Sequence, residues 1–380
     1  GCDRVVHVRP ATHGLIGLLS GRMRPGAVMR DIDYNIYSHA DADGGIASAI
    51  FIRFLMEKSG RSNLNVAVNP VNHGPEQRDW TLTELNYPCA ILDFSLHPAF
   101  LTEKFFSLAG EGALNDSDPL RCYWIDHHPT GAGVPFMTPE NCQSYLRHVL
   151  ALWDIKATST PGLMRKHHVK LGIPQSIIEE YELLIDQAEI IDAALFADAQ
   201  AAHDFSTQAV KLQTLFSSSH PSVDREALYR NLVSQLVKSP HLDDLMNSDP
   251  IYSALIDYEQ RLVLKQMEIY KSRTRILGSV ALTDFMDWPS DTPFPGMGRF
   301  VPYLLFPEIL YAIHVQPNKS GISSISCGIN PWNKPKNQNR HLGNYFANQF
   351  GGGGHAFVAG GRVTTRETHK INELVNFLKN

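Results

Sequence analysis

Carboxylate and imidazole side chains gather in three short segments of this sequence, and each segment follows a predicted strand. The residues concerned are His39, Asp41, Asp43, Asp93, Asp126, His127 and His128. Alternate positions on an extended turn can direct several side chains toward one point, although Asp43 before Gly44 and Gly45 would also suit a helix N-cap. Oxygen and imidazole ligands without thiolates suit Mn²⁺, with Mg²⁺ or another divalent first-row ion as alternatives, and they exclude cysteine-rich structural zinc. These residues therefore predict a metal centre.

A further acidic ligand is expected in the later apolar segment LLIDQAEIID, where Asp192 is our first candidate and Asp186 the alternative. Asp41, Asp43 and Asp93 together with Asp192 carry four negative charges, which two divalent cations would neutralise. Two such ions about 3.5 to 4 Å apart can activate water and stabilise the leaving oxygen of an in-line displacement at phosphorus. The chemistry predicted is hydrolysis of a phosphoester.

A second histidine pair in the chain allows an internal comparison. His167 and His168 lie in the charged segment RKHHVK without a preceding strand or acid, so we expect them at the surface. His127 and His128 instead follow an apolar strand and an aspartate. Neighbouring side chains on an extended segment point to opposite sides, so we expect one of these two to bind metal and the other to act on substrate.

The elements that must position these residues follow a repeating strand and helix pattern in the first half of the chain. Strands are predicted at 34–38, 65–69, 89–93 and 122–126, and helices at 45–58, 98–108 and 160–171. In an open parallel sheet, ligands bind at the carboxyl ends of the strands, which is where the acids and histidines lie. Residues 30–205 are therefore expected to form an α/β catalytic domain built on a parallel sheet.

The second half of the chain has a different pattern. Residues 206–273 carry almost no strand signal and are expected to form a helical segment and inter-domain connector, with a long helix at 252–273. A Pro/Gly-rich loop follows at 287–298. Residues 274–380 are expected to form a smaller α/β C-terminal domain. Its predicted strands are 309–315, 323–327 and 356–363, and its predicted helices are 343–350 and 368–378.

Four consecutive glycines, 351–354, precede His355 between a predicted helix and a predicted strand. Their backbone N–H groups can form a concave anion site, although one or two glycines would satisfy a tight turn. The run matches neither a P-loop nor a dinucleotide fingerprint, so nucleoside triphosphate chemistry is not expected. Lys334, Lys336 and Arg340 add positive charge nearby, with a solvated loop as the alternative interpretation.

Length and composition limit the classes of function. The 380 residues suffice for two to three domains, and 43% hydrophobic with 19% charged residues is typical of a globular protein. The 34 basic and 39 acidic residues give a net charge of −5, so no global positive field would recruit long nucleic acid. Without an 18-residue apolar run, an N-terminal apolar stretch or a C-x-x-C pair among five cysteines, we expect a cytoplasmic protein with reduced thiols and no membrane partner.

Taken in order, the segments HADADG, ILDFS, IDHH, IIDAA and GGGGH resemble the motifs of DHH phosphoesterases with a DHH-associated C-terminal domain. The resemblance covers residues 34–378. Within this family, the chain is similar to the nanoRNases, which are short-oligonucleotide phosphodiesterases. It implies a centre of two Mn²⁺ ions in which Asp93 bridges. The ligands it implies are His39, Asp41 and Asp93 for one ion, and Asp43, Asp93, His127 and Asp192 for the other.

The same resemblance implies how substrate is held. His128 would face the substrate phosphate and Asp126 would support it. The residues expected to bind substrate are Gly352, Gly353, Gly354, His355, Arg340 and Asn330. The last two are included because many family nucleases carry a phosphate-binding arginine in a C-terminal strand, whereas 323–330 reads SSISCGIN here.

The predicted function is hydrolysis of short oligonucleotides or linear dinucleotides to 5′-mononucleotides. The alternatives are a 3′-phosphoadenosine 5′-phosphate phosphatase, a cyclic-dinucleotide phosphodiesterase and, from another class, a nucleotide-binding sensor without catalysis. A net charge of −5 favours a small substrate over long duplex nucleic acid. The helical segment 206–273 is interpreted as a spacer, a lid or the surface of a homodimer.

Overall fold

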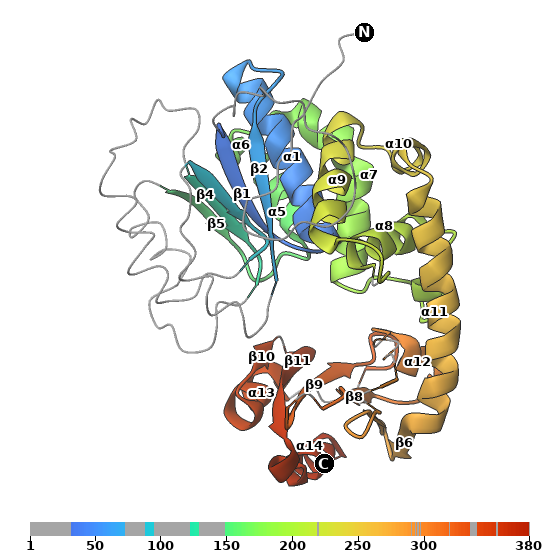
Figure 1. The fold of residues 1–380 in the computed structure, drawn as a ribbon. Coiled ribbons are helices and arrows are strands. Elements are labelled where there is room, and N and C mark those ends of the chain that lie inside the picture. The colour runs from blue at the N-terminus through green and yellow to red at the C-terminus, as the bar shows by residue number, and fades with distance from the viewer. Residues whose placement is uncertain are drawn as a thin grey trace. The chain divides into compact units, whose positions relative to one another are not determined.

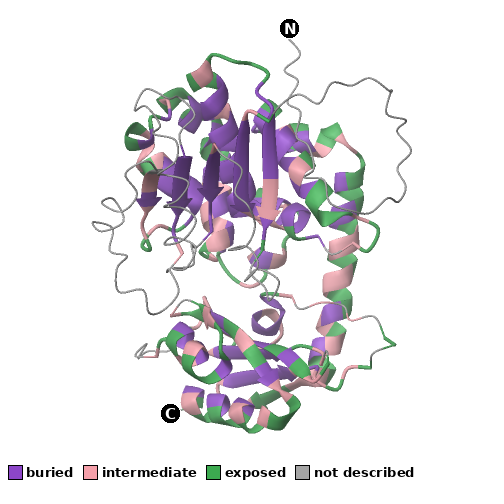
Figure 2. Ribbon diagram, turned by 60° about the vertical axis from the view of Figure 1, so that its left-hand side comes forward, coloured by how far each residue is buried: buried purple, intermediate pink, exposed green. Residues whose placement is uncertain are grey.

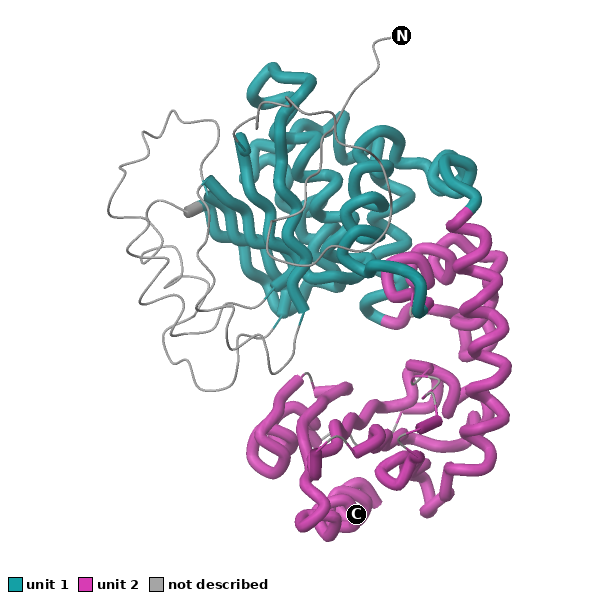
Figure 3. Tube along the Cα trace, viewed as in Figure 1, with its two compact units in different colours: residues 1–128, 135–193, 221–250 teal, residues 129–134, 194–220, 251–380 magenta. Residues whose placement is uncertain are grey.

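The computed structural model describes residues 32–72, 88–94, 122–128, 149–218, 220–289, 291–292, 294, 296, 298–318, 320–334, 340–354 and 356–379. The chain divides into two compact units (Figure 3). Unit 1 takes residues 1–128, 135–193 and 221–250, and unit 2 takes 129–134, 194–220 and 251–380. Within the described ranges, no helix is both long enough and apolar enough to cross a bilayer.

Unit 1 is built on a five-stranded sheet in the order β2-β1-β3-β4-β5, and all of its pairings are parallel (Figure 1). The strands are β1 (Tyr34–His39), β2 (Val66–Val71), β3 (Cys89–Leu92), β4 (Cys122–Asp126) and β5 (Val149–Trp153). The four predicted strands are confirmed, and β5 was not predicted. The strand order reverses beside β1, and such switch points are where open α/β sheets bind ligands.

The helices of unit 1 come from both halves of its sequence. They are α1 (Ala42–Ser59), α5 (Thr160–Lys166), α6 (His168–Leu171), α7 (Gln175–Asp192), α9 (Arg225–Lys238) and α10 (Leu242–Ser248). Helix α1 packs against α5, α7 and α9. The single helix predicted at 160–171 is two helices that meet at His167, and the helix predicted at 98–108 lies outside the described residues.

Helix α1 begins directly after β1 and is buried along most of its length. The strands of the five-stranded sheet are mostly buried as well (Figure 2). Its N-cap is Asp41, whose side chain accepts a hydrogen bond from the Gly44 amide at 3.0 Å, and not Asp43 as the sequence suggested. A Cβ atom at Gly44 would collide with the His39 carbonyl, so glycine is required for this close approach. Gly60 ends the helix with a left-handed φ of 64°.

Unit 2 contains a six-stranded mixed sheet in the order β10-β11-β9-β8-β7-β6, in which only the β7 and β8 pairing is parallel. The strands are β6 (Thr274–Leu277), β7 (Val280–Asp284), β8 (Tyr311–Val315), β9 (Ile322–Ile329), β10 (Gly353–Gly354) and β11 (Val358–Thr364). The apolar faces of α13 (Leu342–Phe350) and α14 (His369–Lys379) pack with these strands into one core. The predicted fold class, a parallel-sheet α/β domain followed by a smaller α/β domain, is confirmed.

The stretch predicted to be helical at 206–273 is shared between the two units. Unit 2 contains η3 (Ala201–His203), α8 (Gln208–Ser217) and α11 (Ile251–Arg273), whereas α9 and α10 belong to unit 1. Unit 2 also contains the short α12 (Val301–Leu305) and η4 (Thr365–Glu367). The chain therefore leaves unit 1 after residue 193, returns to it at 221, and leaves it again after 250.

A buried histidine in unit 2 predicts that stability depends on pH. His314 lies in β8 against the ring of Tyr270, and burial lowers its pKa to about 4. The unfolded chain binds this proton near pH 6.5, so stability is lost as pH falls from 6.5 toward 4, by about 2 kcal/mol between pH 7 and pH 5. Urea unfolding at both pH values should show this loss in the wild type and much less of it in His314→Gln. An equal loss in the two proteins would contradict the assignment.

Candidate metal centre

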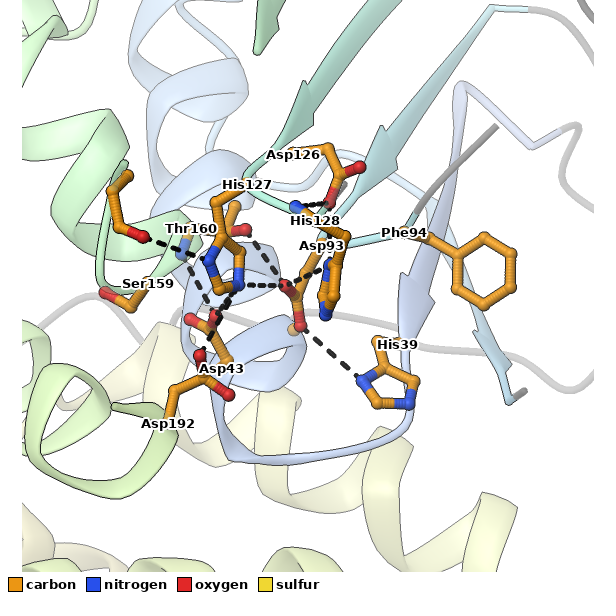
Figure 4. Close-up of polar contacts among 12 residues, drawn as sticks. His39, Asp43, Asp93, Phe94, Asp126, His127, His128, Ser159, Thr160 and Asp192 are labelled. Atoms are coloured by element: carbon orange, nitrogen blue, oxygen red, sulfur yellow. Dashed lines mark hydrogen bonds and ion pairs between the residues drawn. The ribbon is translucent and has the colours of Figure 1, made fainter. Parts of the chain in front are cut away.

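The first group of candidate ligands lies where β1 turns into α1 (Figure 4). His39 is the last residue of β1, and its Nδ1 lies 2.7 Å from Oδ2 of Asp41. Asp43 lies in the first turn of α1 and is 3% exposed. The tight turn permitted by Gly44 therefore brings one imidazole and two carboxylates together within five residues of sequence.

Asp93 lies directly after β3 and faces both groups of ligands. Its backbone is left-handed, with φ of 57°, and its side chain is 1% exposed. Oδ2 lies 3.7 Å from Nδ1 of His39, whereas Oδ1 lies 3.3 Å from Nε2 of His127. The two oxygens of one buried carboxylate thus face different histidines, which is the arrangement that a bridging ligand requires.

His127 lies at the centre of the second group. Its Nε2 lies 3.3 Å from Oδ2 of Asp43, 3.3 Å from Oδ1 of Asp93 and 3.6 Å from Oδ2 of Asp192. Its Nδ1 lies 3.3 Å from the carbonyl oxygen of Ala157, which can only accept a hydrogen bond. In a neutral, metal-binding ring the proton would therefore reside on Nδ1, and the Nε2 lone pair would face the carboxylates, as in histidines that bind metal ions.

Three sets of side chains are compact enough to hold a metal ion, because their donor atoms all lie within 4.8 Å of one another. The sets are His39 with Asp41 and Asp93, Asp43 with His127 and Asp192, and Asp93 with His127 and His128. All six residues that the sequence suggested as metal ligands are thus brought together. Their assignment to particular ions stays a prediction.

The electrostatics of this group fit divalent cations. Oδ1 of Asp43, Oδ2 of Asp93 and Nε2 of His127 are buried without a hydrogen-bond partner among the described residues. Burying polar atoms without a partner costs folding free energy, unless a bound cation interacts with them. Burial, followed by the Asp93 charge, raises the pKa of Asp43 well above its usual value. Burial disfavours the charged form of His127, but Asp43 and Asp93 outweigh it and raise its pKa to about 12.

His128 is held by Asp126, the last residue of β4. Its Nδ1 lies 2.8 Å from Oδ1 of Asp126, which also accepts the His128 backbone amide at 3.1 Å. The expectation that His127 and His128 point to opposite sides is wrong, because their ring centroids are 4.5 Å apart and Nδ1 of His128 lies 3.7 Å from Oδ1 of Asp93. The chain bends after β4 and so does not continue the alternation of the strand.

Helix α7 decides between the two acids proposed for the last ligand. Asp192 ends the helix beside His127, whereas Asp186 binds Arg165 at 2.6 Å. Glu189, one turn before Asp192, binds the same arginine at 2.8 Å. The structure therefore places Asp192 at the candidate centre and gives Asp186 a different partner.

Two residues near the centre were missed by the sequence interpretation. The backbone amide and hydroxyl of Thr160 contact Asp43 and Asp93. The hydroxyl of Tyr229, on α9, donates to the His39 carbonyl at 3.0 Å and shares a 2.7 Å hydrogen bond with Ser38. Both contact residues far away in sequence, so no local spacing could have revealed them.

The glycine run lies in unit 2 between α13 and β11, and its members differ in their surroundings. Gly351 and Gly354 have positive φ values of 58° and 138°. A Cβ at Gly352 would collide with the Gly360 carbonyl, but a Cβ at Gly353 would meet no atom of the described residues within 4 Å. Open space therefore lies beside Gly353, and its φ is not left-handed. His355 lies outside the described residues.

Asn330 and Arg340 have structural partners in unit 2. The Asn330 side chain, 1% exposed, donates to the Ile309 carbonyl at 2.9 Å and accepts the Trp332 amide at 3.0 Å. The Arg340 guanidinium donates to the Leu378 carbonyl at 2.6 Å and lies over the Phe377 ring. These contacts already engage both side chains. The role of Asn330 and Arg340 as substrate ligands stays a prediction.

Gly353 offers a clean test of phosphate binding by the glycine run. We expect Gly353→Val to raise KM by at least about tenfold, because the branched side chain fills the space that a phosphate would need beside the backbone N–H groups. Metal content and thermal stability should not change, since the added atoms meet no neighbour among the described residues. Steady-state kinetics with a dinucleotide substrate would measure this, and an unaltered KM would leave the run as a structural turn.

Comparison with known proteins yields structural neighbours alone, since no protein-family model and no curated protein matches this chain. The pGpG-specific phosphodiesterase PggH from Vibrio cholerae superposes with a TM-score of 0.59 and 15% identity, over 91% of this chain and 99% of that one. RecJ from Thermus thermophilus, in complex with Mn²⁺, superposes with a TM-score of 0.50 and 14% identity. That match covers 90% of this chain and 51% of RecJ, so this chain spans about half the RecJ length.

These likenesses concern the fold. The chain has the fold of the DHH phosphoesterases, which confirms at this level the resemblance read from its motifs. The activity named for PggH and the metal ion named for RecJ are properties of those two proteins.

Proposed function

We propose that this chain is a metal-dependent phosphodiesterase that hydrolyses short oligonucleotides or linear dinucleotides to 5′-mononucleotides. The observation that carries the proposal is the position of Asp93, whose two oxygens face His39 on one side and His127 on the other. A buried carboxylate between two candidate ligand sets suits a pair of ions. The shared fold with a pGpG-specific phosphodiesterase supports a small nucleotide substrate.

The residues that would hold the ions are His39, Asp41, Asp43, Asp93, His127 and Asp192. Their mixed oxygen and nitrogen donors suit Mn²⁺, with Mg²⁺ or another divalent first-row ion as the alternative. Two bound ions would supply an activated water and neutralise negative charge on the phosphoryl group. Four carboxylates balance two divalent charges, so the occupied centre would accept an anionic phosphoester.

The chain's own contribution to the chemistry centres on His128 and Asp126. The Asp126 carboxylate accepts from Nδ1 of His128 and so fixes one proton on that nitrogen. Burial lowers the pKa of His128, but Asp126 and Asp93 outweigh it and raise the pKa above its usual value. The raised pKa favours the doubly protonated ring, in which Nε2 would donate a proton to the substrate phosphate or leaving oxygen.

The proposal also covers the cellular compartment of the enzyme, its partners and its substrate contacts. The described cysteines, Cys89, Cys122 and Cys327, are buried free thiols, which suits a reducing cytoplasmic compartment. The proposed partners are a short oligonucleotide or dinucleotide and, through the helices of residues 206–273, a second copy of the chain. Substrate contacts are assigned to Gly352, Gly353, Gly354 and His355, with Arg340 and Asn330 as further candidates.

The decisive experiment is an assay of the metal-stripped full chain on a panel of substrates. The panel is pGpG, an RNA pentamer, an RNA 20-mer, a cyclic dinucleotide and 3′-phosphoadenosine 5′-phosphate. We expect no turnover in excess EDTA, recovery best with Mn²⁺, release of 5′-mononucleotides, and rates that fall as the RNA lengthens. Asp186→Asn is the matched control and should behave as the wild type, because Asp186 binds Arg165.

Each other outcome has a defined meaning. Full turnover in excess EDTA would overturn the metal dependence, and equal rates on the pentamer and the 20-mer would overturn the preference for short substrates. Turnover confined to the cyclic dinucleotide or to 3′-phosphoadenosine 5′-phosphate would establish an alternative enzyme. Nucleotide binding without any turnover would make the chain a sensor.

A further inference from the structure

The residues 157–160, between β5 and α5, contact three of the candidate metal ligands at once (Figure 4). The carbonyl of Ala157 lies 3.3 Å from Nδ1 of His127. The Thr160 amide donates to Oδ2 of Asp43 at 3.0 Å, and the Thr160 hydroxyl donates to Oδ1 of Asp93, also at 3.0 Å. One short segment thus orients an imidazole and two carboxylates.

Thr160 is held in a buried position at the start of a helix. It is the first residue of α5 and is 0% exposed. Ser159 caps the helix by accepting the Gly162 amide at 3.0 Å, so the Thr160 amide, which has no partner within the helix, is free to face Asp43. A Cβ atom at Gly162 would collide with Oε1 of Glu189, so a side chain there would force this carboxylate to move.

The segment is also fastened to the helix that carries Asp192. The Thr158 hydroxyl donates to Oε1 of Glu189 at 3.1 Å, and Oε2 of the same carboxylate binds Arg165 of α5 at 2.8 Å. Both contacts tie residues 158–165 to α7. The ligand at the end of α7 and the segment that orients the other ligands are therefore held in one assembly.

We infer that Thr160 is a positioning residue of the metal centre, whose hydroxyl fixes the orientation of the Asp93 carboxylate between the two ligand sets. With Oδ1 of Asp93 held by Thr160, Oδ2 stays buried without a hydrogen-bond partner among the described residues and is directed toward the His39 set. Without this donor the carboxylate would rotate, and one ligand set would lose its shared oxygen. The inference rests on the proposed metal centre and adds a residue that would not itself touch an ion.

The test compares three variants of the metal-stripped full chain by calorimetric titration with Mn²⁺. Thr160→Val removes the hydroxyl, keeps the branched shape and keeps the backbone amide bond to Asp43. Loss of a hydrogen-bond partner behind a metal ligand weakens metal affinity by roughly 10- to 100-fold, and we expect a change of this size. Thr160→Ser should restore the wild-type affinity. Thr274→Val is the matched control, because its hydroxyl bonds the Thr283 hydroxyl in the sheet of unit 2 and no candidate ligand.

The outcomes separate this inference from the proposed function. Wild-type Mn²⁺ affinity in Thr160→Val, or an equal loss in Thr160→Ser, would overturn the role of the hydroxyl while leaving the metal centre intact. Failure of the wild type to bind Mn²⁺ would overturn both. Binding of two ions without turnover on any substrate would overturn the proposed function alone. If circular dichroism shows that Thr160→Val does not fold, the same titration of Thr160→Ala decides.

Discussion

Replacing Asp93 with asparagine should remove both metal ions and reduce kcat by at least about 10³-fold, because each ion contributes several kcal/mol to stabilising the transition state. Asparagine keeps the shape of the side chain and tolerates the left-handed backbone at this position, so the fold should persist. The lost charge is the one that faces both His39 and His127. Elemental analysis of metal per chain and kcat on pGpG would measure the two effects together.

Asp186→Asn is the matched control for this variant. It removes an aspartate of α7 that is half exposed and paired with Arg165, so two ions and wild-type turnover are expected. Two tightly bound ions in Asp93→Asn would show that Asp93 does not bridge. Loss of one ion alone would assign Asp93 to a single ligand set.

Replacing the two adjacent histidines with alanine should give different defects. His128→Ala should lower kcat by about 10²- to 10⁴-fold with metal content intact, because it removes a proton donor and not an ion ligand. His127→Ala should lower metal occupancy, because Nε2 of His127 lies within 3.6 Å of three carboxylate oxygens. Metal content and kcat of each variant distinguish the two roles.

The second histidine pair supplies the controls for that comparison. His167 and His168 are partly exposed, and Nδ1 of His168 lies 3.1 Å from the carbonyl of Ile173, away from any candidate ligand. Alanine at either position should leave metal content and kcat unchanged. Loss of an ion in His128→Ala would make His128 a ligand, which its 3.7 Å distance to Asp93 permits.

The candidate centre could be predicted from sequence because parallel strands bring their carboxyl ends together. His39, Asp93 and His127 are far apart in the chain but lie at the ends of β1, β3 and β4, which are neighbours in the sheet. Helical geometry also predicts that Asp186 and Asp192 cannot both face the centre, although it does not choose between them. Six residues at about 100° per residue place these two side chains on different faces of one helix.

Other features were beyond the sequence interpretation for physical reasons. Thr160 and Tyr229 act through hydrogen bonds to residues far away in sequence, which produce no periodic pattern. Asn330 and Arg340 were considered for their chemistry, yet backbone carbonyls of unit 2 already accept from both. The β6 and β7 hairpin did have a signal that was overlooked, since Gly278 and Ser279 form a two-residue connection with φ of 69° at the glycine.

The interleaving of the two units fixes the order in which unit 1 is completed during synthesis. Every candidate ligand has been synthesised by residue 192, but Tyr229, which holds the end of β1, arrives only with α9. A nascent chain that has reached residue 205 would carry the whole ligand set without this support, although N-terminal domains generally fold first. Metal capture should therefore become tight only after residue 250 has emerged from the ribosome, when the last part of unit 1 is available.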